Sequence, residues 1–410
     1  MKHSCLDEPE LRFPTFSDNW SQKQMKDICV VSQGLQIPIS ERFAEDGENR
    51  YFYITNEFLK ENAEKEYFIE NPPKSVICTE NDVLMTRTGN TGKVITNVNG
   101  VFHNNFFKID YDDSIIDKDF LCYFLNNFNT QKMIMRLAGT STIPDLNHKD
   151  FYSIKINYPS LPEQRKISDF LKKIDKKIDL LEQKHKHYKD FKNYSMQQIF
   201  TQKLRFKDAN GDYYNNWEKI LLKDADIIIS DGNYGEAYPK EKDFTNEGVP
   251  FIRVVNIQNS KLTFEDMRYI SPSLHSKLLQ GHLNENDILI STRGDIGLIA
   301  YVTKEFANSN INAQLCLLRV NDENICPKYL FYFLSTPFSQ RQLLQFQTGS
   351  ALKQLPKNNL KYLKLIIPPY EEQKKIVDFL VEIDKSIGLI EENILKFNQF
   401  KKGLLQKMFL

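Results

Sequence analysis

The chain has 410 residues, of which 41% are hydrophobic, and its 54 basic residues balance its 54 acidic ones. This length predicts about two or three globular domains. No run approaches the ~20 apolar residues of a membrane span, and residues 1–10 lack the apolar core of a signal peptide, so we expect a cytoplasmic protein. The six cysteines and seven histidines lack ligand spacing, which argues against a metal site.

The first part of the chain predicts an α+β domain. Short β-like runs occur at 51–55, 83–86 and 93–97, and a helical pattern covers 118–127. Glycine-containing loops separate these elements. Their polar residues include Gln33, Arg87, Thr140 and Ser141.

Residues 160–200 predict one long helix. Ser160 and Glu163 have capping-box spacing, with Pro162 in the first turn. Apolar residues then recur at spacings of four and three, as in a coiled-coil seam: Ile167, Leu171, Ile174, Ile178 and Leu181. Residues 160–207 carry 13 Lys and Arg against six Asp and Glu, which predicts a basic, solvated strip.

A second α+β part follows the turn-rich segment 207–212. Strands are expected at 251–257, 287–291 and 314–320, and a helix at 327–335. A second coiled-coil row then runs to the C-terminus, with Lys401 as its one break: Ile376, Leu380, Ile383, Ile387, Ile390, Ile394, Phe397, Leu404 and Met408.

The two halves are copies of one design. A shift of 209 residues matches thirteen of the twenty positions from 163 to 182, where unrelated sequences would match at roughly one. We therefore expect globular parts at 1–158 and 204–367 and helical spacers at 159–203 and 368–410. The fold class is α+β, with an internal pseudo-twofold repeat and two long helices that pack on each other as an antiparallel coiled coil or dock on a partner.

No catalytic pattern emerges from the sequence. Asn71-Pro72-Pro73-Lys74 resembles a base-holding methyltransferase motif but has lysine where an aromatic residue would stack on the base. Gly89-Asn90-Thr91-Gly92-Lys93 is too short for a phosphate-binding loop. We therefore interpret the chain as a binding protein rather than an enzyme.

The doubled helix start carries a family resemblance. Glu163, Gln164 and Ile167 return as Glu372, Gln373 and Ile376, and this doubled motif resembles the specificity subunit of type I restriction-modification systems. The resemblance implies two target-recognition domains that each read one half of a split double-stranded DNA sequence. It also implies that two modification methyltransferase subunits and the restriction subunits are partners, and that S-adenosylmethionine, ATP and Mg²⁺ belong to them, with no cofactor in this chain.

Polar residues in the repeated loops are the candidate DNA contacts, because arginine pairs with guanine, amides with adenine, and Lys, Ser and Thr with phosphates. The predicted DNA-binding residues are Gln33, Arg87, Thr140, Ser141, Asn233, Tyr234, Arg253, Asn256, Arg293, Ser350 and Lys353. The predicted helix-packing residues are Ile167, Leu171, Ile174, Ile178, Ile376, Leu380, Ile383, Ile387 and Ile390. Two alternatives remain at this point: a structural coiled-coil protein, or a methyltransferase or nuclease in its own right.

Overall fold

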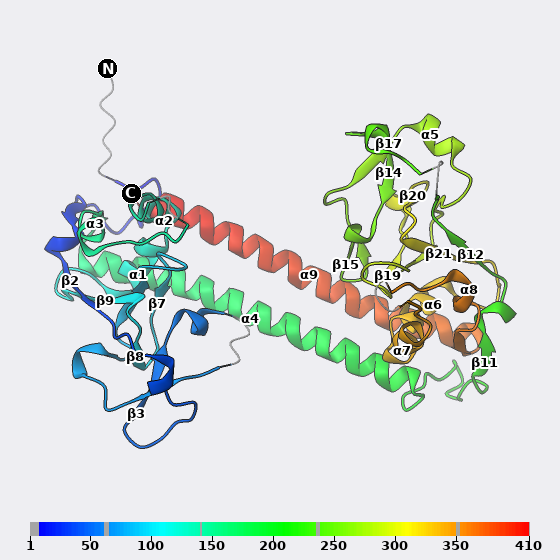
Figure 1. Ribbon diagram of the computed structural model, residues 1–410, viewed down its shortest axis with the longest axis horizontal. Helices are drawn as coiled ribbons and strands as arrows, with labels where there is room; N and C mark the ends of the chain where they lie inside the picture. Colours follow the sequence, from blue (N-terminus) through cyan, green and yellow to red (C-terminus); the bar gives the residue numbers. More distant parts are fainter. Residues whose placement is uncertain (1–7, 61–64, 140–141, 235–237, 350–352, 410) are drawn as a thin grey trace. The chain divides into compact units, whose positions relative to one another are not determined.

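The computed structural model describes residues 8–60, 65–139, 142–234, 238–349 and 353–409. The chain divides into two compact units (Figure 1). Unit 1 comprises residues 1–183 and 391–410, and unit 2 comprises residues 184–390. The long helices α4 (Leu161–Phe200) and α9 (Tyr370–Met408) therefore contribute one segment each to both units.

The globular part of unit 1 is built on two four-stranded sheets. One is antiparallel with strand order β2-β9-β6-β7, and the other has the order β4-β3-β8-β5 with a parallel pair between β3 and β8. A short ladder pairs β1 with β10. The strands are β1 (Ser21–Gln24), β2 (Cys29–Gln33), β3 (Arg50–Ile54), β4 (Phe68–Glu70), β5 (Ile77–Cys78), β6 (Val83–Thr86), β7 (Val94–Ile95), β8 (Gly100–Phe102), β9 (Phe106–Tyr111) and β10 (Lys155–Tyr158).

Three of the described helices of unit 1 share a core with the β2-β9-β6-β7 sheet. They are α1 (Lys118–Asn126), α2 (Phe128–Leu137) and α3 (His148–Tyr152). The apolar residues at the start of α4 share one buried core with α1 and with Leu404, Met408 and Phe409. The α4 and α9 segments of this unit run antiparallel (Figure 1).

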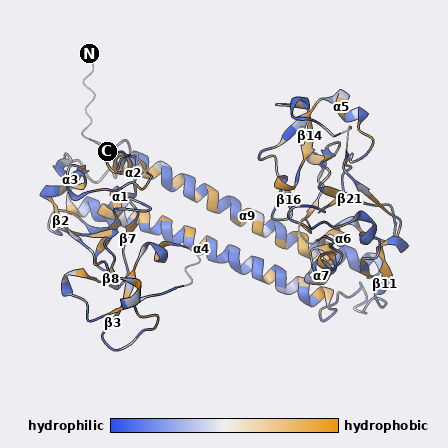
Figure 2. Cartoon of the chain, in the orientation of Figure 1, coloured by the Kyte–Doolittle hydropathy of each residue, from blue (hydrophilic) through white to orange (hydrophobic). Residues whose placement is uncertain are grey.

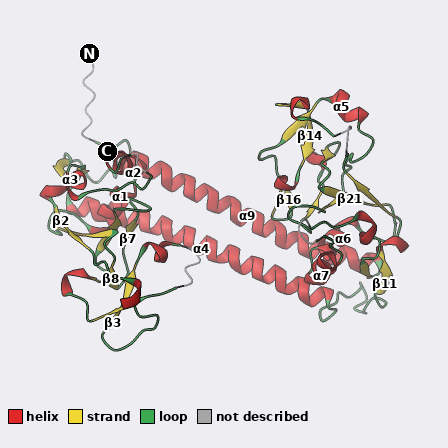
Figure 3. Ribbon diagram, viewed as in Figure 1, coloured by secondary structure: helices red, strands yellow, loops and turns green. Residues whose placement is uncertain are grey.

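Unit 2 repeats this plan. Its sheets have the orders β12-β21-β18-β19 and β13-β17-β14-β20, again with one parallel pair, β14 with β20, and a ladder joins β11 to β22 (Figure 3). The strands are β11 (Glu218–Leu221), β12 (Ile227–Asp231), β13 (Phe244–Thr245), β14 (Val249–Ile252), β15 (Ile257–Gln258), β16 (Lys261–Leu262), β17 (Arg268–Ile270), β18 (Ile288–Ser291), β19 (Ile299–Tyr301), β20 (Asn310–Ile311), β21 (Leu315–Val320) and β22 (Lys364–Ile367). The helices are α5 (Pro272–Lys277), α6 (Pro327–Leu334), α7 (Pro337–Gln345) and α8 (Lys357–Leu360).

In unit 2 the end of α4 packs against the start of α9 and α6. Met196, Ile199 and Phe200 lie in one core with Ile376, Leu380 and Ile383. The Phe200 ring lies 5.6 Å from the ring of Tyr329 in α6. The helix surfaces are otherwise mostly hydrophilic (Figure 2).

A buried arginine–glutamate joint occurs once in each unit. In unit 1, Arg12 donates from Nε and Nη2 to the two carboxylate oxygens of Glu163, both at 2.8 Å. In unit 2, Arg205 makes the same two bonds to Glu372, at 3.1 and 2.6 Å. The glutamate side chains are 1% and 0% exposed, so each joint ties the segment before the globular part to the start of a long helix.

The glutamine after each glutamate joins the helix start to the turn before α1 or α6. Gln164 accepts from the Asp117 backbone N–H and donates to the carbonyls of Ile115 and Pro159. Gln373 accepts from the Cys326 N–H and donates to the carbonyls of Asn324 and Pro368. The repeated Glu-Gln pair is therefore structural.

Each unit also contains one Tyr–Asp–Lys cluster that ties α4 to α9. In unit 2, Asp384 of α9 accepts from the Tyr332 hydroxyl at 2.6 Å and pairs with Lys192 of α4 at 2.6 Å. In unit 1, Asp175 of α4 accepts from Tyr123 at 2.8 Å and pairs with Lys401 of α9. Lys192 and Lys401 interrupt the apolar rows, and the structure gives each of them this partner.

The predicted fold class is confirmed. The nine predicted helix-packing residues are all buried, none being more than 8% exposed. The strand expected at 251–257 was wrong in part, because β14 ends at Ile252 and a short 3₁₀ helix, Val254–Asn256, intervenes before β15. The strand at 93–97 is limited to Val94–Ile95, since Asn97 takes a positive φ of 59°.

Candidate nucleic-acid interface

Polar loops of unit 2 meet at one edge of the sheet β12-β21-β18-β19. Asp231 ends β12 opposite Cys316, and Ser291 ends β18 opposite Leu315. The loops after these strands therefore lie beside the loop that enters β21. The Thr292 N–H donates to the Gln314 carbonyl at 2.7 Å, which joins the loop after β18 to the loop before β21.

Two of the predicted residues come together at this edge. The Arg293 guanidinium carbon lies 5.8 Å from the centre of the Tyr234 ring. Both residues are exposed, and within the described part of the chain no acidic partner neutralises Arg293. The edge therefore presents a cation and an aromatic face to solvent.

Asp231, at the end of β12, contacts both Lys357 and Tyr234. It pairs with Lys357 of α8 at 3.2 Å. Partial burial and a hydrogen bond to Asp231 raise the pKa of Tyr234, so its hydroxyl stays protonated. Sequence reasoning missed Lys357 as a member of this edge, because its position follows from the fold of a segment more than 100 residues away.

The corresponding edge of unit 1 has a different electrostatic arrangement. Gln33 ends β2 and is exposed, as Asp231 ends β12. Arg87 after β6 is held by Asp145, with Nε–Oδ1 and Nη2–Oδ2 distances of 3.1 and 2.9 Å. Its charge is therefore already paired.

Arg87 and Arg293 occupy different backbone positions. The Arg87 N–H donates to the Asn105 carbonyl, and Arg87 accepts from the Leu146 N–H. In unit 2 it is Thr292, rather than Arg293, that makes the same two bonds, to Gln314 and Leu355. Consecutive residues of extended backbone point in opposite directions, so this one-residue offset turns the two guanidinium groups to different sides.

Three other predicted residues are used within the domain. Asn233, 2% exposed, donates to the Gln280 carbonyl and accepts from the Leu279 N–H. Asn256, fully buried, accepts from the Arg253 N–H and donates to the Glu265 carbonyl. Arg253 itself donates to the Asp266 carbonyl at 2.5 Å. Their hydrogen bonds hold loops in place.

Lys353 is exposed at the edge of unit 2, next to Gln354, which forms a backbone bridge with Arg293. Thr140, Ser141 and Ser350 lie outside the described residues. Among the residues that the structure describes, no group of three or more His, Cys, Asp or Glu could hold a metal ion, and no helix is long and apolar enough to cross a membrane.

Known proteins match the chain over most of its length. Residues 17–190 and 214–397 each match the family model described as the type I restriction modification DNA specificity domain. The type I restriction enzyme MjaVIII specificity subunit of Methanocaldococcus jannaschii is 25% identical over 96% of this chain and 92% of its own length. The EcoBI specificity subunit of Escherichia coli is 22% identical over 96% of this chain and 86% of its own length.

Solved structures agree on the fold. The S subunit of a type I restriction-modification system from M. genitalium superposes with a TM-score of 0.61, at 16% identity, and covers 98% of this chain and 99% of its own. A second structure, from work on complex assembly of the type I system, has a TM-score of 0.55 at 16% identity and covers 95% of this chain and 97% of its own. Because the family model matches both halves of the chain, the chain belongs to the type I restriction-modification DNA specificity family.

Proposed function

We propose that this chain is the DNA-reading subunit of a type I restriction-modification complex and recognises a split double-stranded target. Each unit reads one half of the target. Two modification methyltransferase subunits and the restriction subunits dock on the chain in the cytoplasm. Methyl transfer and cleavage, with S-adenosylmethionine, ATP and Mg²⁺, are carried out by those partners, and this chain has no catalytic role.

The observation that carries the proposal is the repetition of a shared frame with unlike loops. The Arg–Glu joint, the glutamine contacts and the Tyr–Asp–Lys cluster recur in both units. The polar edges differ, since Arg87 is paired with Asp145 and Arg293 lies against Tyr234. A common frame with different exposed edges suits a protein that reads two different base sequences.

The edge of unit 2 has the chemistry required for base reading. An unpaired guanidinium can donate two hydrogen bonds to guanine in the major groove, and phosphate contacts from lysines such as Lys353 would position the domain. Tyr234 adds an aromatic surface next to the guanidinium. In unit 1, Gln33 is the exposed amide that could pair with adenine.

The test is to assemble the chain with its cognate methyltransferase and sequence the DNA that the complex methylates. We expect a target of two short specified segments separated by unspecified base pairs. A continuous target, or methyl transfer by the chain without its partner, would contradict the proposal. Absence of salt-dependent DNA binding by the complex would instead favour a structural coiled-coil protein, because phosphate contacts release counterions and make DNA binding depend steeply on salt.

A further inference from the structure

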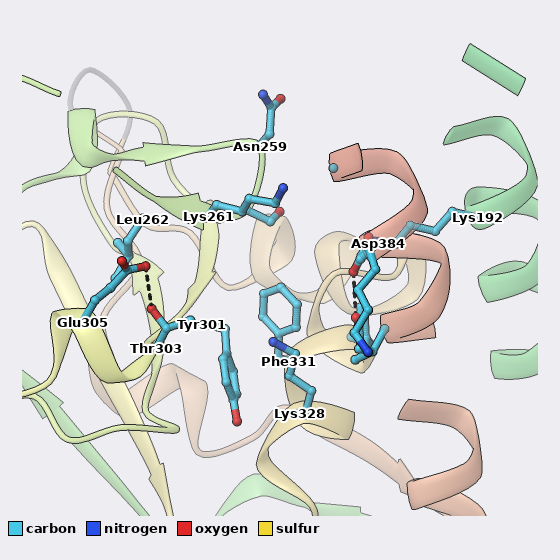
Figure 4. Close-up of a pocket in the computed structure, with 15 residues that line it drawn as sticks. Lys192, Asn259, Lys261, Leu262, Tyr301, Thr303, Glu305, Lys328, Phe331 and Asp384 are labelled. Carbon is cyan, nitrogen blue, oxygen red and sulfur yellow. Dashed lines mark hydrogen bonds and ion pairs between the residues drawn. The ribbon is translucent and has the colours of Figure 1, made fainter. Parts of the chain in front are cut away.

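A cavity of about 450 Å³ opens in unit 2 where α6, the β16–β19 region and the long helices meet (Figure 4). Lys328, Tyr301 and Phe331 lie on one wall, and Lys192 and Asp384 lie on another. The volume falls within the range of small-molecule sites in proteins, about 300 to 1,000 Å³.

Lys328 is the unusual residue of this cavity. Its Nζ lies 3.8 Å from the centre of the Tyr301 ring and 5.3 Å from that of Phe331. Within the described part of the chain it forms no hydrogen bond or ion pair. Burial lowers the pKa of Lys328, whereas the nearby Asp384 carboxylate raises it and the charge of Lys192 lowers it.

The acidic residues of the cavity form no ion pair with Lys328 among the residues that the structure describes. The two carboxylate oxygens of Asp384 are taken by Lys192 and Tyr332, each at 2.6 Å. Glu305 accepts from the Thr303 hydroxyl at 3.1 Å (Figure 4). The cavity thus has a half-buried ammonium group with no direct ion-pair partner in the described part of the chain, although the Asp384 carboxylate lies near it.

Unit 1 contains the repeat-related cavity, in which the lysines form ion pairs with aspartates. It is lined by the matching cluster of Tyr123, Asp175 and Lys401. The repeat places Asp119 where unit 2 has Lys328, and Lys172 where unit 2 has Val381. Asp119 and Lys172 form an ion pair. The change from an ion pair to a lone lysine is therefore specific to unit 2.

We propose that the cavity of unit 2 binds a phosphate group through Lys328 and Lys192. A half-buried cation without a direct ion pair is costly, and an anion bound next to it offsets part of that cost. Lysine binds phosphate as a compact charge with three donors. The phosphate comes either from a free compound such as a nucleotide or from a DNA strand, and in the second case the site rests on the proposed DNA-binding function.

The first test titrates the full-length chain with ATP and with inorganic phosphate by calorimetry at low salt. We expect one molecule bound per chain, and Lys328→Gln to weaken binding about tenfold or more, as loss of a charged hydrogen-bond donor does. Lys328→Arg keeps the charge and should retain most of the affinity. Thermal unfolding of each variant checks that it folds.

Two exchange variants use the repeat as the matched control. Lys328→Asp with Val381→Lys introduces the ion pair of unit 1 into unit 2 and should abolish binding. Asp119→Lys with Lys172→Val does the reverse in unit 1 and should raise the stoichiometry to two.

A third arm replaces the free compounds with a short DNA duplex. One supporting result is that only the duplex binds and that both Lys328→Gln and the exchange in unit 2 weaken duplex binding. In that case the phosphate group at the site belongs to DNA. Binding of ATP, phosphate and duplex that Lys328→Gln leaves unchanged, or no binding by any of them, overturns the proposal.

Discussion

In unit 1 the arginine that follows β6 is bound to Asp145, whereas in unit 2 the arginine that follows β18 lies exposed beside Tyr234. The two arginine–glutamate hydrogen bonds at the start of each long helix, by contrast, join the same atoms in both units. Buried contacts with unique geometry were kept in both copies, and the exposed edges diverged. This contrast separates the residues that hold the frame from those available to a ligand.

The largest expected effect comes from breaking an Arg–Glu joint. Glu372→Ala should lower the free energy of unfolding by about 3 to 5 kcal/mol, because it leaves a largely buried Arg205 without its partner. The Trp217 indole also loses its 2.9 Å bond to Glu372. Glu163→Ala should lower the free energy of unfolding less, since the Trp20 indole has no hydrogen-bond partner among the described residues. Denaturant unfolding measures both.

The control for this comparison is Glu382→Ala, which removes an exposed ion pair with Lys385 in α9. Such pairs contribute roughly 0 to 1 kcal/mol. Equal losses of stability from Glu372→Ala and Glu382→Ala would show that the buried joint does not hold the frame.

The second effect concerns the arginines. Arg293→Ala should reduce discrimination at one position of the target by about 1 to 3 kcal/mol, the value of a bidentate arginine–guanine pair. Arg87→Ala should change base discrimination less, because Asp145 already occupies that guanidinium group. Competition binding of the assembled complex to targets with single base changes, at fixed salt, measures the difference. A larger loss from Arg87→Ala would reverse the assignment.

A smaller effect is expected at the Tyr–Asp–Lys clusters. Lys192 and Asp384 are partly exposed, so a double-mutant cycle of Lys192→Met and Asp384→Asn should give a coupling of about 1 kcal/mol or less. The repeat-related pair, Lys401 and Asp175, should give a similar value. Couplings of opposite sign in the two units would show that the clusters are not equivalent.

The smallest effect is expected from Lys353→Gln. An exposed lysine that contacts a phosphate should weaken DNA binding alike for all base sequences and reduce the slope of log affinity against log salt by about 1. Lys396→Gln, on α9, serves as the matched exposed control and should leave the slope unchanged. Sequence-dependent weakening by Lys353→Gln would mean that this lysine reads bases.

The sequence predicted the fold better than the candidate site. The apolar rows and the shift of 209 residues predicted the long helices and the repeat, because heptad spacing and internal identity are local properties of the sequence. The partners of Lys192 and Lys401 could not be predicted from those rows, since each lysine meets an aspartate from the other copy.

The DNA-contacting side chains of the loops were also difficult to predict, because they depend on tertiary contacts. Asn233 and Asn256 have the residue type of a base reader, but their amides bond to backbone groups, those of a distant loop for Asn233 and those of a nearby turn for Asn256. Arg87 and Arg293 follow similar strand sequences but differ by one position relative to the flanking glycines, and the backbone hydrogen bonds show the same offset of one residue. Residue type and spacing identify polar loops, whereas the tertiary fold decides which side chains remain available.

The central claim is that each unit reads its own half of a split target. It is tested most directly by replacing the globular part of unit 1, residues 1–158, with that of a relative and sequencing the DNA methylated by the assembled complex. The account predicts that one specified segment changes while the other segment and the number of base pairs between them stay the same. A change in both segments, or in neither, would contradict it.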